Sequence, residues 1–287
     1  MAAVRRPVCS GRPRRDRLRG GHVRTVRVTG AEFDVRDEGE GDAVLLVAGG
    51  GASGRVWDLH QVPALRAAGF RVLTFDRRPL RNTQAAPDPR TAAVELLYVL
   101  AELDLPRCRA VGVSAGAEVV QELMLARPGL VTGAVLMATR GRGDLSGRAM
   151  ADAERELAAA GVRLPPRYAA WQRAVLNLSP ATWRREDELL DWLDLFEAAE
   201  RAGTAPVPVP ADGEPADRLA ALGRVTVPVL VLGFEHDLIV PPWLCREVAA
   251  ALPSARYAEI ADCGHYGYLE RPAEVNSALL EFLTGAP

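Results

Sequence analysis

Short apolar runs alternate along this chain with segments of helical periodicity, and this alternation constrains the possible folds more than any other feature. Ala43–Ala48, Arg71–Phe75 and Ala110–Val113 are mostly apolar runs of strand length. Runs of this kind are typical of parallel strands that are buried on both faces. Amphipathic helical segments such as Arg90–Leu103 separate them. The sequence therefore predicts an α/β fold in which helices wrap a mostly parallel sheet.

The predicted sheet extends in both directions from these runs. Arg24–Val28 and Glu32–Arg36 alternate in polarity around a short turn and predict a hairpin. The C-terminal part of the chain predicts three more strands, at Ala134–Ala138, Val227–Gly233 and Arg256–Ile260.

The region from about Arg140 to Arg224 interrupts this alternation of strands and helices, because no strand is evident in it. Its helical segments are Asp144–Ala160, Pro166–Leu178 and Thr182–Ala202, followed by the proline-rich linker Ala205–Pro215. We interpret the region as a helical lid inserted between two core strands. The predicted units are a disordered basic leader (residues 1–23), a core (24–139 and 225–287) and the lid (140–224).

The composition excludes several classes of function. A net charge of −2 implies no polyanionic partner. The seven arginines of Met1–Gly21 could bind nucleic acid or acidic lipid, but a disordered leader is the preferred interpretation. The chain has no lysine, so it cannot form a Schiff base or complete a Walker-type phosphate loop. Its four cysteines have no zinc-ligand or disulfide spacing. No run approaches the roughly 18 apolar residues of a membrane span. We expect a cytoplasmic monomer or homodimer that binds a small-molecule substrate, without nucleic acid, membrane, metal or cofactor.

A G-x-S-x-G pentapeptide, GVSAG, occupies positions 112–116. It follows a predicted strand and precedes the helix-like run Ala115–Arg127, which is the context of a nucleophile elbow. Ser114 is therefore the candidate nucleophile, with an ordinary turn serine as the alternative.

A serine nucleophile needs a base, and the base needs an orienting acid. His265 lies in a loop between the last strand and the last helix, and Asp237 follows the strand before it. The order Ser114, Asp237, His265 is the nucleophile–acid–base order of α/β-hydrolases. Other acids and thiols compete for these roles: Glu235, Asp262 and Asp144 for the acid, and Cys263, which lacks an elbow, for the nucleophile.

From about Arg24 onward the chain resembles the α/β-hydrolase superfamily, most closely its esterases and cofactor-free haloperoxidase-like hydrolases. The resemblance rests on the stretch from Trp57 to Arg78, on Gly264-His265, and on Glu270-Arg271-Pro272 before the last helix. It implies the α/β-hydrolase fold, with a mostly parallel eight-stranded sheet and an inserted helical lid.

An oxyanion hole made of two backbone amides is expected beside the nucleophile. The first donor is Ala115, and aligning Trp57 with the family's tryptophan implies Gly50 as the second. A merely flexible linker is the alternative for this glycine-rich stretch. Two departures stand out: Ala48-Gly49 replaces the family's usual His-Gly, and Pro79–Thr83 replaces a stretch rich in glycine and serine.

Aromatic residues of the predicted lid either pack it on the core or line an apolar pocket. The predicted pocket residues are Gly51, Arg81, Tyr168, Trp171, Trp183, Trp192 and Tyr266. The sequence thus predicts a serine hydrolase for a bulky, largely apolar ester, lactone or thioester. The alternatives are an elimination, cyclisation or acyl transfer in secondary metabolism, and an inactive ligand-binding scaffold.

Overall fold

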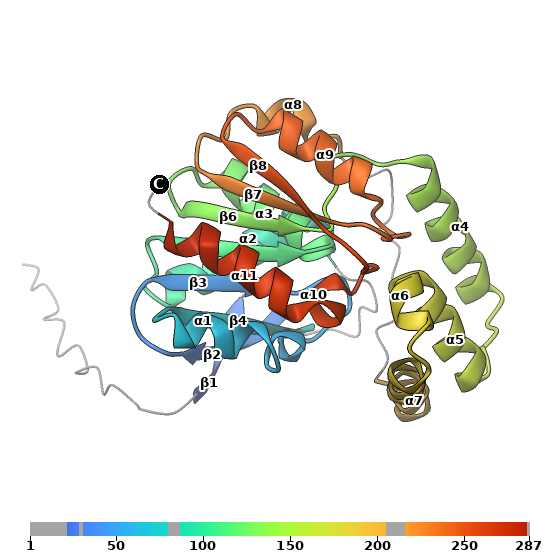
Figure 1. Cartoon of the computed structure of the whole chain (residues 1–287). Helices are drawn as coiled ribbons and strands as arrows, with labels where there is room; N and C mark the ends of the chain where they lie inside the picture. Colours follow the sequence, from blue (N-terminus) through green and yellow to red (C-terminus); the bar gives the residue numbers. More distant parts are fainter. Residues whose placement is uncertain (1–21, 29–30, 80–86, 205–215, 286–287) are drawn as a thin grey trace, which may run out of the picture.

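An eight-stranded sheet forms the centre of the molecule in the computed structural model, which describes residues 22–28, 31–79, 87–204 and 216–285. The strand order is β1-β2-β4-β3-β5-β6-β7-β8 (Figure 1). β2 is antiparallel to β1 and β4, and the other pairs are parallel. The strands are His22–Val28 (β1), Ala31–Glu38 (β2), Ala43–Val47 (β3), Arg71–Pro79 (β4), Cys108–Val113 (β5), Val131–Met137 (β6), Val229–Phe234 (β7) and Ala255–Ile260 (β8). The predicted α/β-hydrolase fold is confirmed.

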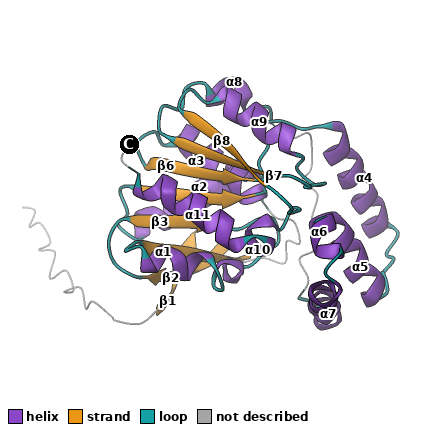
Figure 2. Ribbon diagram, viewed as in Figure 1, coloured by secondary structure: helices purple, strands orange, loops and turns teal. Residues whose placement is uncertain are grey.

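The central strands are apolar along their length because helices cover both faces of the sheet (Figure 2). Leu45, Val111, Val135 and Val231 on four neighbouring strands are all inaccessible to solvent. α1 and α11 lie on one face, and α2 and α3 lie on the other. The core helices are α1 (Gln61–Ala67), α2 (Pro89–Glu102), α3 (Ala115–Ala126), α8 (Leu219–Leu222), α9 (Pro242–Ala251), α10 (Gly267–Glu270) and α11 (Pro272–Thr284).

Four helices between β6 and the return to the core lie beside the end of the sheet and make up the region that the sequence analysis interprets as a lid, a name kept below (Figure 1). They are α4 (Leu145–Ala159), α5 (Pro166–Asn177), α6 (Pro180–Trp183) and α7 (Glu186–Ala202). The segment predicted as helical over Thr182–Ala202 is helical except at residues 184–185, which separate α6 from α7. A separate short helix starts at Pro180, where the Ser179 hydroxyl caps its first turn by accepting from Thr182 N at 3.3 Å.

The boundaries of the units differ from the prediction at two points. β1 begins at His22, two residues before the predicted start of the core. α8 falls within the predicted lid, but its Leu222 is fully buried in the main core. The leader up to residue 21 and the linker Ala205–Pro215 lie outside the described residues. Within the described part of the chain, no helix has both the length and the apolar character to cross a membrane.

A buried arginine fixes both ends of the lid insertion to α3. The side chain of Arg218 is only 5% exposed and donates to Gln121 Oε1 at 2.9 Å and to Glu118 Oε2 at 2.5 Å. Arg140, where the chain leaves the core, lies 3.5 Å from the same Glu118 carboxylate. Because α3 begins directly after Ser114, this cluster connects the lid to the helix of the elbow.

Replacing Arg218 with methionine removes a donor from the buried Gln121 amide oxygen and from the partly buried Glu118 carboxylate. Removing one partner of a buried ion pair typically costs about 3–5 kcal/mol, so we expect Arg218→Met to lower the free energy of unfolding by about that amount. Urea unfolding measures it, with Arg224→Met at an exposed position as the control. A loss below about 1 kcal/mol would contradict the role given to Arg218.

Candidate active site

Ser114 occupies a sharp turn between β5 and α3. Its backbone has φ +55° and ψ −127°, a region that residues other than glycine rarely adopt. Two backbone hydrogen bonds fix the turn: Ser114 N donates to Met137 O at 2.9 Å, and Ser114 O accepts from Ala117 N at 2.9 Å. The serine is partly exposed at the carboxyl edge of the sheet, as a nucleophile elbow requires.

The glycines of the pentapeptide are required by close backbone packing. A Cβ added at Gly112 would lie 2.5 Å from Gly116 O. A Cβ added at Gly116 would lie 2.3 Å from Val47 O and 2.4 Å from Ala48 O. No side chain fits at either position without moving β3 or α3, so the pattern follows from the geometry of the turn.

Asp237 and His265 lie side by side at the same edge of the sheet. They follow β7 and β8, which are neighbouring parallel strands, so their loops meet. His265 Nδ1 is 2.8 Å from Asp237 Oδ2, and the Asp237 side chain is fully buried. The other carboxylate oxygen, Oδ1, accepts from the amides of Ile239 and Val240, both at 2.8 Å. This fixed carboxylate favours the tautomer with hydrogen on Nδ1, which leaves Nε2 as the basic nitrogen.

The link from serine to histidine is the part of the site that stays a prediction. Ser114 Oγ and His265 make no direct hydrogen bond in the described part of the chain. Such bonds are often long without substrate and tighten in the complex. The structure thus brings the predicted acid and base into contact and puts the predicted nucleophile on an elbow at the same edge.

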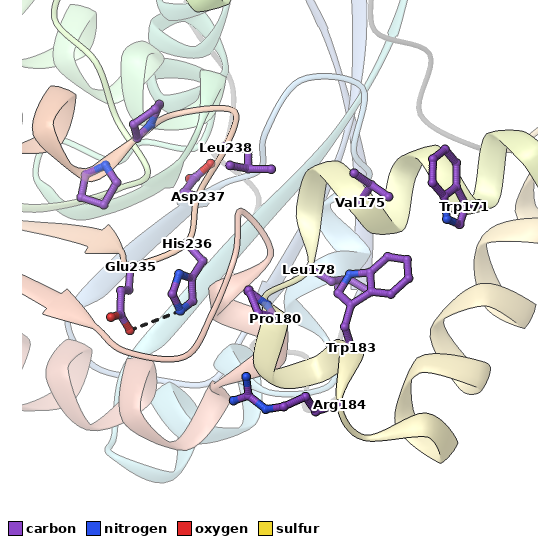
Figure 3. A pocket seen from close by; sticks show the side chains of 12 residues that line it. Trp171, Val175, Leu178, Pro180, Trp183, Arg184, Glu235, His236, Asp237 and Leu238 are labelled. Carbon is purple, nitrogen blue, oxygen red and sulfur yellow. Dashed lines mark ion pairs between the residues drawn. The ribbon is translucent and has the colours of Figure 1, made fainter.

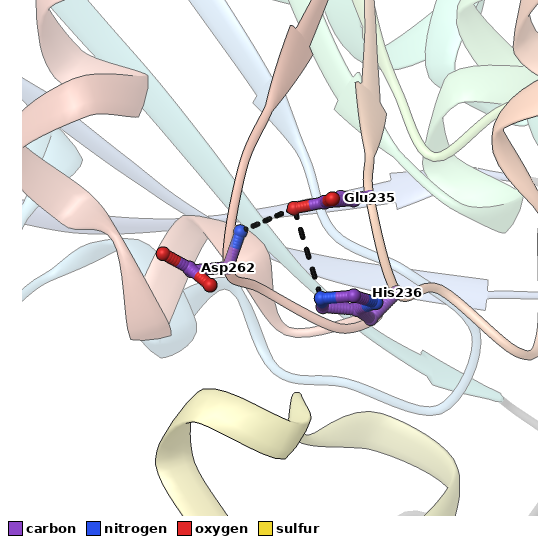
Figure 4. A group of neighbouring side chains, drawn as sticks. All are labelled: Glu235, His236 and Asp262. Atoms are coloured by element: carbon purple, nitrogen blue, oxygen red, sulfur yellow. Dashed lines mark hydrogen bonds and ion pairs between the residues drawn. The ribbon is translucent and has the colours of Figure 1, made fainter.

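The competing acids are occupied elsewhere. Glu235 accepts from the amide of Asp262 at 2.9 Å and lies 3.7 Å from His236 Nε2 (Figure 4). Asp144 accepts from the amides of Ser146 and Gly147 and so caps α4. The hydrogen bond to His265 therefore distinguishes Asp237 from these alternatives.

Glu235, His236 and Asp262 also form a group whose potential ligand atoms lie within 4.8 Å of one another. Two of these side chains are exposed, the Glu235 carboxylate is engaged by a backbone amide, and Asp262 lies 3.6 Å from Arg271. We assign no metal or cofactor to this group.

Cys263 has the wrong environment for a nucleophile. Its thiol is buried and donates to Ile260 O at 3.3 Å. Burial raises the pKa of this thiol well above its usual range, so it stays protonated at neutral pH.

The glycine-rich stretch after β3 lies against the elbow. A Cβ added at Gly50 would be 3.7 Å from Ala115 Cβ, and one at Gly49 would be 3.4 Å from Ser114 Cβ. In the described part of the chain, neither the Gly50 nor the Ala115 amide donates to another protein group. The two expected oxyanion donors are therefore adjacent, and their role stays a prediction. Gly51 follows with φ +70°, a left-handed conformation that favours glycine.

Asp76 anchors the segment that follows this glycine-rich stretch, a role that the sequence analysis missed. Its carboxylate accepts from Ser53 Oγ at 2.6 Å, Gly54 N at 2.7 Å and Arg36 at 2.8 Å. Burial raises the pKa of Asp76, but the hydrogen bonds and the arginine charge outweigh burial and hold it below its usual value. Since Asp76 lies on β4, its partners could not be read from local spacing.

The depressed pKa of Asp76 predicts a pH-dependent contribution to stability. The stabilisation is present above the unfolded-state pKa of about 4 and is lost as pH falls through the lower folded-state value. We expect Asp76→Asn to be less stable than wild type by about 1 kcal/mol at pH 7, and the gap should shrink below about pH 4. Urea unfolding at both pH values measures this, with the exposed Asp191→Asn as control. A gap that does not vary with pH would contradict the assignment.

A cavity of about 750 Å³ lies between the lid and the loop after β7 (Figure 3). Its apolar lining comes from α5, α6 and that loop: Trp171, Val175, Leu178, Pro180, Trp183 and Leu238. Trp171 and Trp183 were predicted to line a pocket, and they do border this cavity. Asp237 also borders it, whereas Ser114 and His265 do not.

The other predicted pocket residues lie elsewhere. Tyr168 is half exposed and packs on Trp171, with 5.7 Å between ring centroids. Trp192 and Tyr266 are 6.3 Å apart and contact the small apolar core of the lid around Phe196. Arg81 lies outside the described residues, as does most of the departing stretch Pro79–Thr83. A substrate contact for these residues stays a prediction.

Comparison with known proteins identifies the family. The model described as "Alpha/beta hydrolase family" matches residues 44–278. A protein of Mycobacterium tuberculosis H37Rv named as a non-heme bromoperoxidase, BpoC, is 44% identical over 249 residues, which cover 86% of this chain and 95% of that protein. Its crystal structure superposes with a TM-score of 0.79 at 40% identity, covering 93% of this chain and 98% of the other. The chain therefore belongs to the alpha/beta hydrolase family.

Two further similarities bear on the chemistry. Rhodomycin D methylesterase DauP of Streptomyces sp. C5 is 29% identical over 276 residues, covering 84% of this chain and 92% of DauP. A thermophilic esterase from Thermogutta terrifontis has a TM-score of 0.74 at 25% identity, covering 91% of this chain and 98% of the esterase. Relatives named as hydrolases thus match nearly the whole length of this chain, which supports an enzyme with hydrolase activity.

Proposed function

We propose that this protein is a serine hydrolase that cleaves a carboxylic ester, lactone or thioester of a bulky, largely apolar small molecule. The observation that carries the proposal is the hydrogen-bonded pair of Asp237 and His265 at the sheet edge that also bears the Ser114 elbow. Relatives named as esterases support the same reaction class.

In the proposed reaction, His265 Nε2 takes the proton of the Ser114 hydroxyl as its oxygen attacks the substrate carbonyl. Asp237 holds the imidazole ring and stabilises the imidazolium that forms. The amides of Gly50 and Ala115 donate to the oxyanion. The leaving alcohol or thiol takes the proton from His265, and water, activated by the same base, then releases the acid from Ser114.

An apolar cavity that borders Asp237, though neither Ser114 nor His265, supports the choice of an apolar substrate. Its lining is dominated by indole, aliphatic and proline side chains, and its volume of about 750 Å³ lies in the usual range for small-molecule sites. The name of DauP describes a methylesterase acting on rhodomycin D, which is a substrate of that protein. By analogy we propose a small organic ester for this chain.

A second candidate follows from the name of BpoC, the relative at 44% identity. If hydrogen peroxide replaces water in attack on the acyl-serine, the product is a peracid and free Ser114. The peracid can oxidise bromide to hypobromite while it becomes the carboxylic acid. This oxidation depends on the same nucleophile and needs no metal. Formation of a brominated product in the presence of ester, peroxide and bromide would favour this second candidate.

The mass of the product also separates hydrolysis, which adds water, from elimination or cyclisation.

Ser114→Ala removes the proposed nucleophile while it leaves the Asp237–His265 pair in place. We expect turnover of a p-nitrophenyl ester to fall by about 10³-fold or more, together with complete loss of labelling by a fluorophosphonate probe. Activity assays and gel-based labelling measure the two effects.

Ser10→Ala, in the leader, is the matched control and should label like the wild type. Labelling that survives in Ser114→Ala would contradict the nucleophile assignment. Wild-type protein that reacts with neither the probe nor any of a panel of esters would contradict the proposed function as a whole.

A further inference from the structure

Glu270 is a buried carboxylate that contacts both the lid and the loop of His265. Its Oε1 accepts from the amide of Ser179 at 2.9 Å, the hydroxyl of Ser179 at 3.0 Å and the hydroxyl of Thr182 at 2.6 Å. Its Oε2 accepts from the amide of Gly264 at 2.6 Å. The residue is only 7% exposed. One side chain thus joins the α5–α6 junction to the residue next to the proposed base.

The surrounding backbone forms a second set of links between the same two segments. The amide of Tyr266 donates to Asn177 O at 3.1 Å, and the single hydrogen of the Ser179 hydroxyl is shared between Glu270 Oε1 and Asp262 O, which lies 2.9 Å from Ser179 Oγ. A Cβ added at Gly264 would lie 2.5 Å from Asn177 O. Residues 177–182 of the lid and residues 262–266, the histidine loop, are therefore in direct contact on both sides of Glu270.

We propose that Glu270 is a positioning residue that holds the histidine loop and makes the placement of His265 depend on the docking of the lid. This inference rests on the proposed hydrolase function, because it takes His265 as the base. Glu270 acts through Gly264 and the lid residues and contacts neither the substrate nor the reacting atoms. When Ser179 and Thr182 leave the carboxylate, Gly264 loses its fixed acceptor, so the lid and the base move together.

Glu270 is surrounded by hydrogen-bond donors. The amides of Ser179 and Gly264 can only donate, one to each carboxylate oxygen, and a carboxylate is the side-chain group that accepts at both ends. Arg185 donates to Thr182 Oγ1 at 3.1 Å, which directs the hydrogen of that hydroxyl toward Glu270. Glutamine has the same shape, but its NH₂ group would face either Gly264 N–H or the lid donors. One side of the link must then break.

Glu270→Gln therefore tests the proposal with little change in volume. With p-nitrophenyl acetate, whose acyl group is small, we expect kcat to fall by about 10- to 100-fold while KM stays within about threefold. A residue that only anchors the lid would instead raise KM for bulky esters and leave kcat for the acetate ester unchanged. Glu274→Gln, at an exposed site four residues away in the chain, is the control and should match wild type.

Amide hydrogen exchange supplies a readout that does not depend on catalysis. We expect faster exchange in Glu270→Gln at both residues 177–183 and residues 262–267. Thr182→Val, a milder change in the lid alone, should also speed exchange at residues 262–267. In a double-mutant cycle on kcat, the two substitutions together should cost clearly less than the product of their separate effects.

Unchanged exchange in the histidine loop of Glu270→Gln, or a kcat within twofold of wild type, would overturn the inference. Effects of Thr182→Val and Glu270→Gln that simply multiply would overturn the coupling between lid and base. A wild-type protein that fails to react with the fluorophosphonate probe would instead overturn the proposed hydrolase function. The exchange result would then still decide whether Glu270 links the two segments.

Discussion

The close contact of three backbone segments at Ser114 is the constraint on which the proposed site depends. β3, the end of β5 and the start of α3 approach so closely that neither Gly112 nor Gly116 has room for a Cβ. This tight turn holds the backbone of Ser114 at φ +55°, a conformation whose strain costs of order 1–3 kcal/mol. The buried central strands and the backbone bonds to Met137 and Ala117 offset this strain. The sheet therefore sets the position of the serine.

The parallel arrangement of the sheet explains the rest of the site. Loops that follow parallel strands collect at one edge, so residues far apart in sequence are placed at the same edge: Ser114 after β5, Asp237 after β7 and His265 after β8. Carboxylates then fix the loops at this edge. Asp76 holds the segment after the glycine-rich stretch, and Glu270 holds the histidine loop against the lid. Acidic side chains that take no direct part in the proposed chemistry thus fix the segments next to the proposed oxyanion donors and the proposed base.

The sequence predicts the features that local patterns encode. Continuous apolar runs predicted the buried strands, and the order of Ser114, Asp237 and His265 identified the acid–base pair that the structure brings into contact. Local patterns did not predict contacts between residues that are distant in sequence. The role of Asp76 depends on Gly54, 22 positions away, and the link of Glu270 to the lid depends on Ser179, 91 positions away. Aromatic character alone also failed to distinguish Trp183, which borders the cavity, from Trp192, which packs inside the lid.

The central claim is that the strained elbow presents Ser114 for acyl transfer. Mass spectrometry of the protein after rapid acid quench during turnover of a slow ester tests this claim most directly. The account predicts one added acyl group per protein molecule, located by peptide mapping on Ser114 and removed on further incubation in water. An acyl group carried by Cys263 or another residue, or ester turnover with no acyl-protein at any quench time, would contradict it.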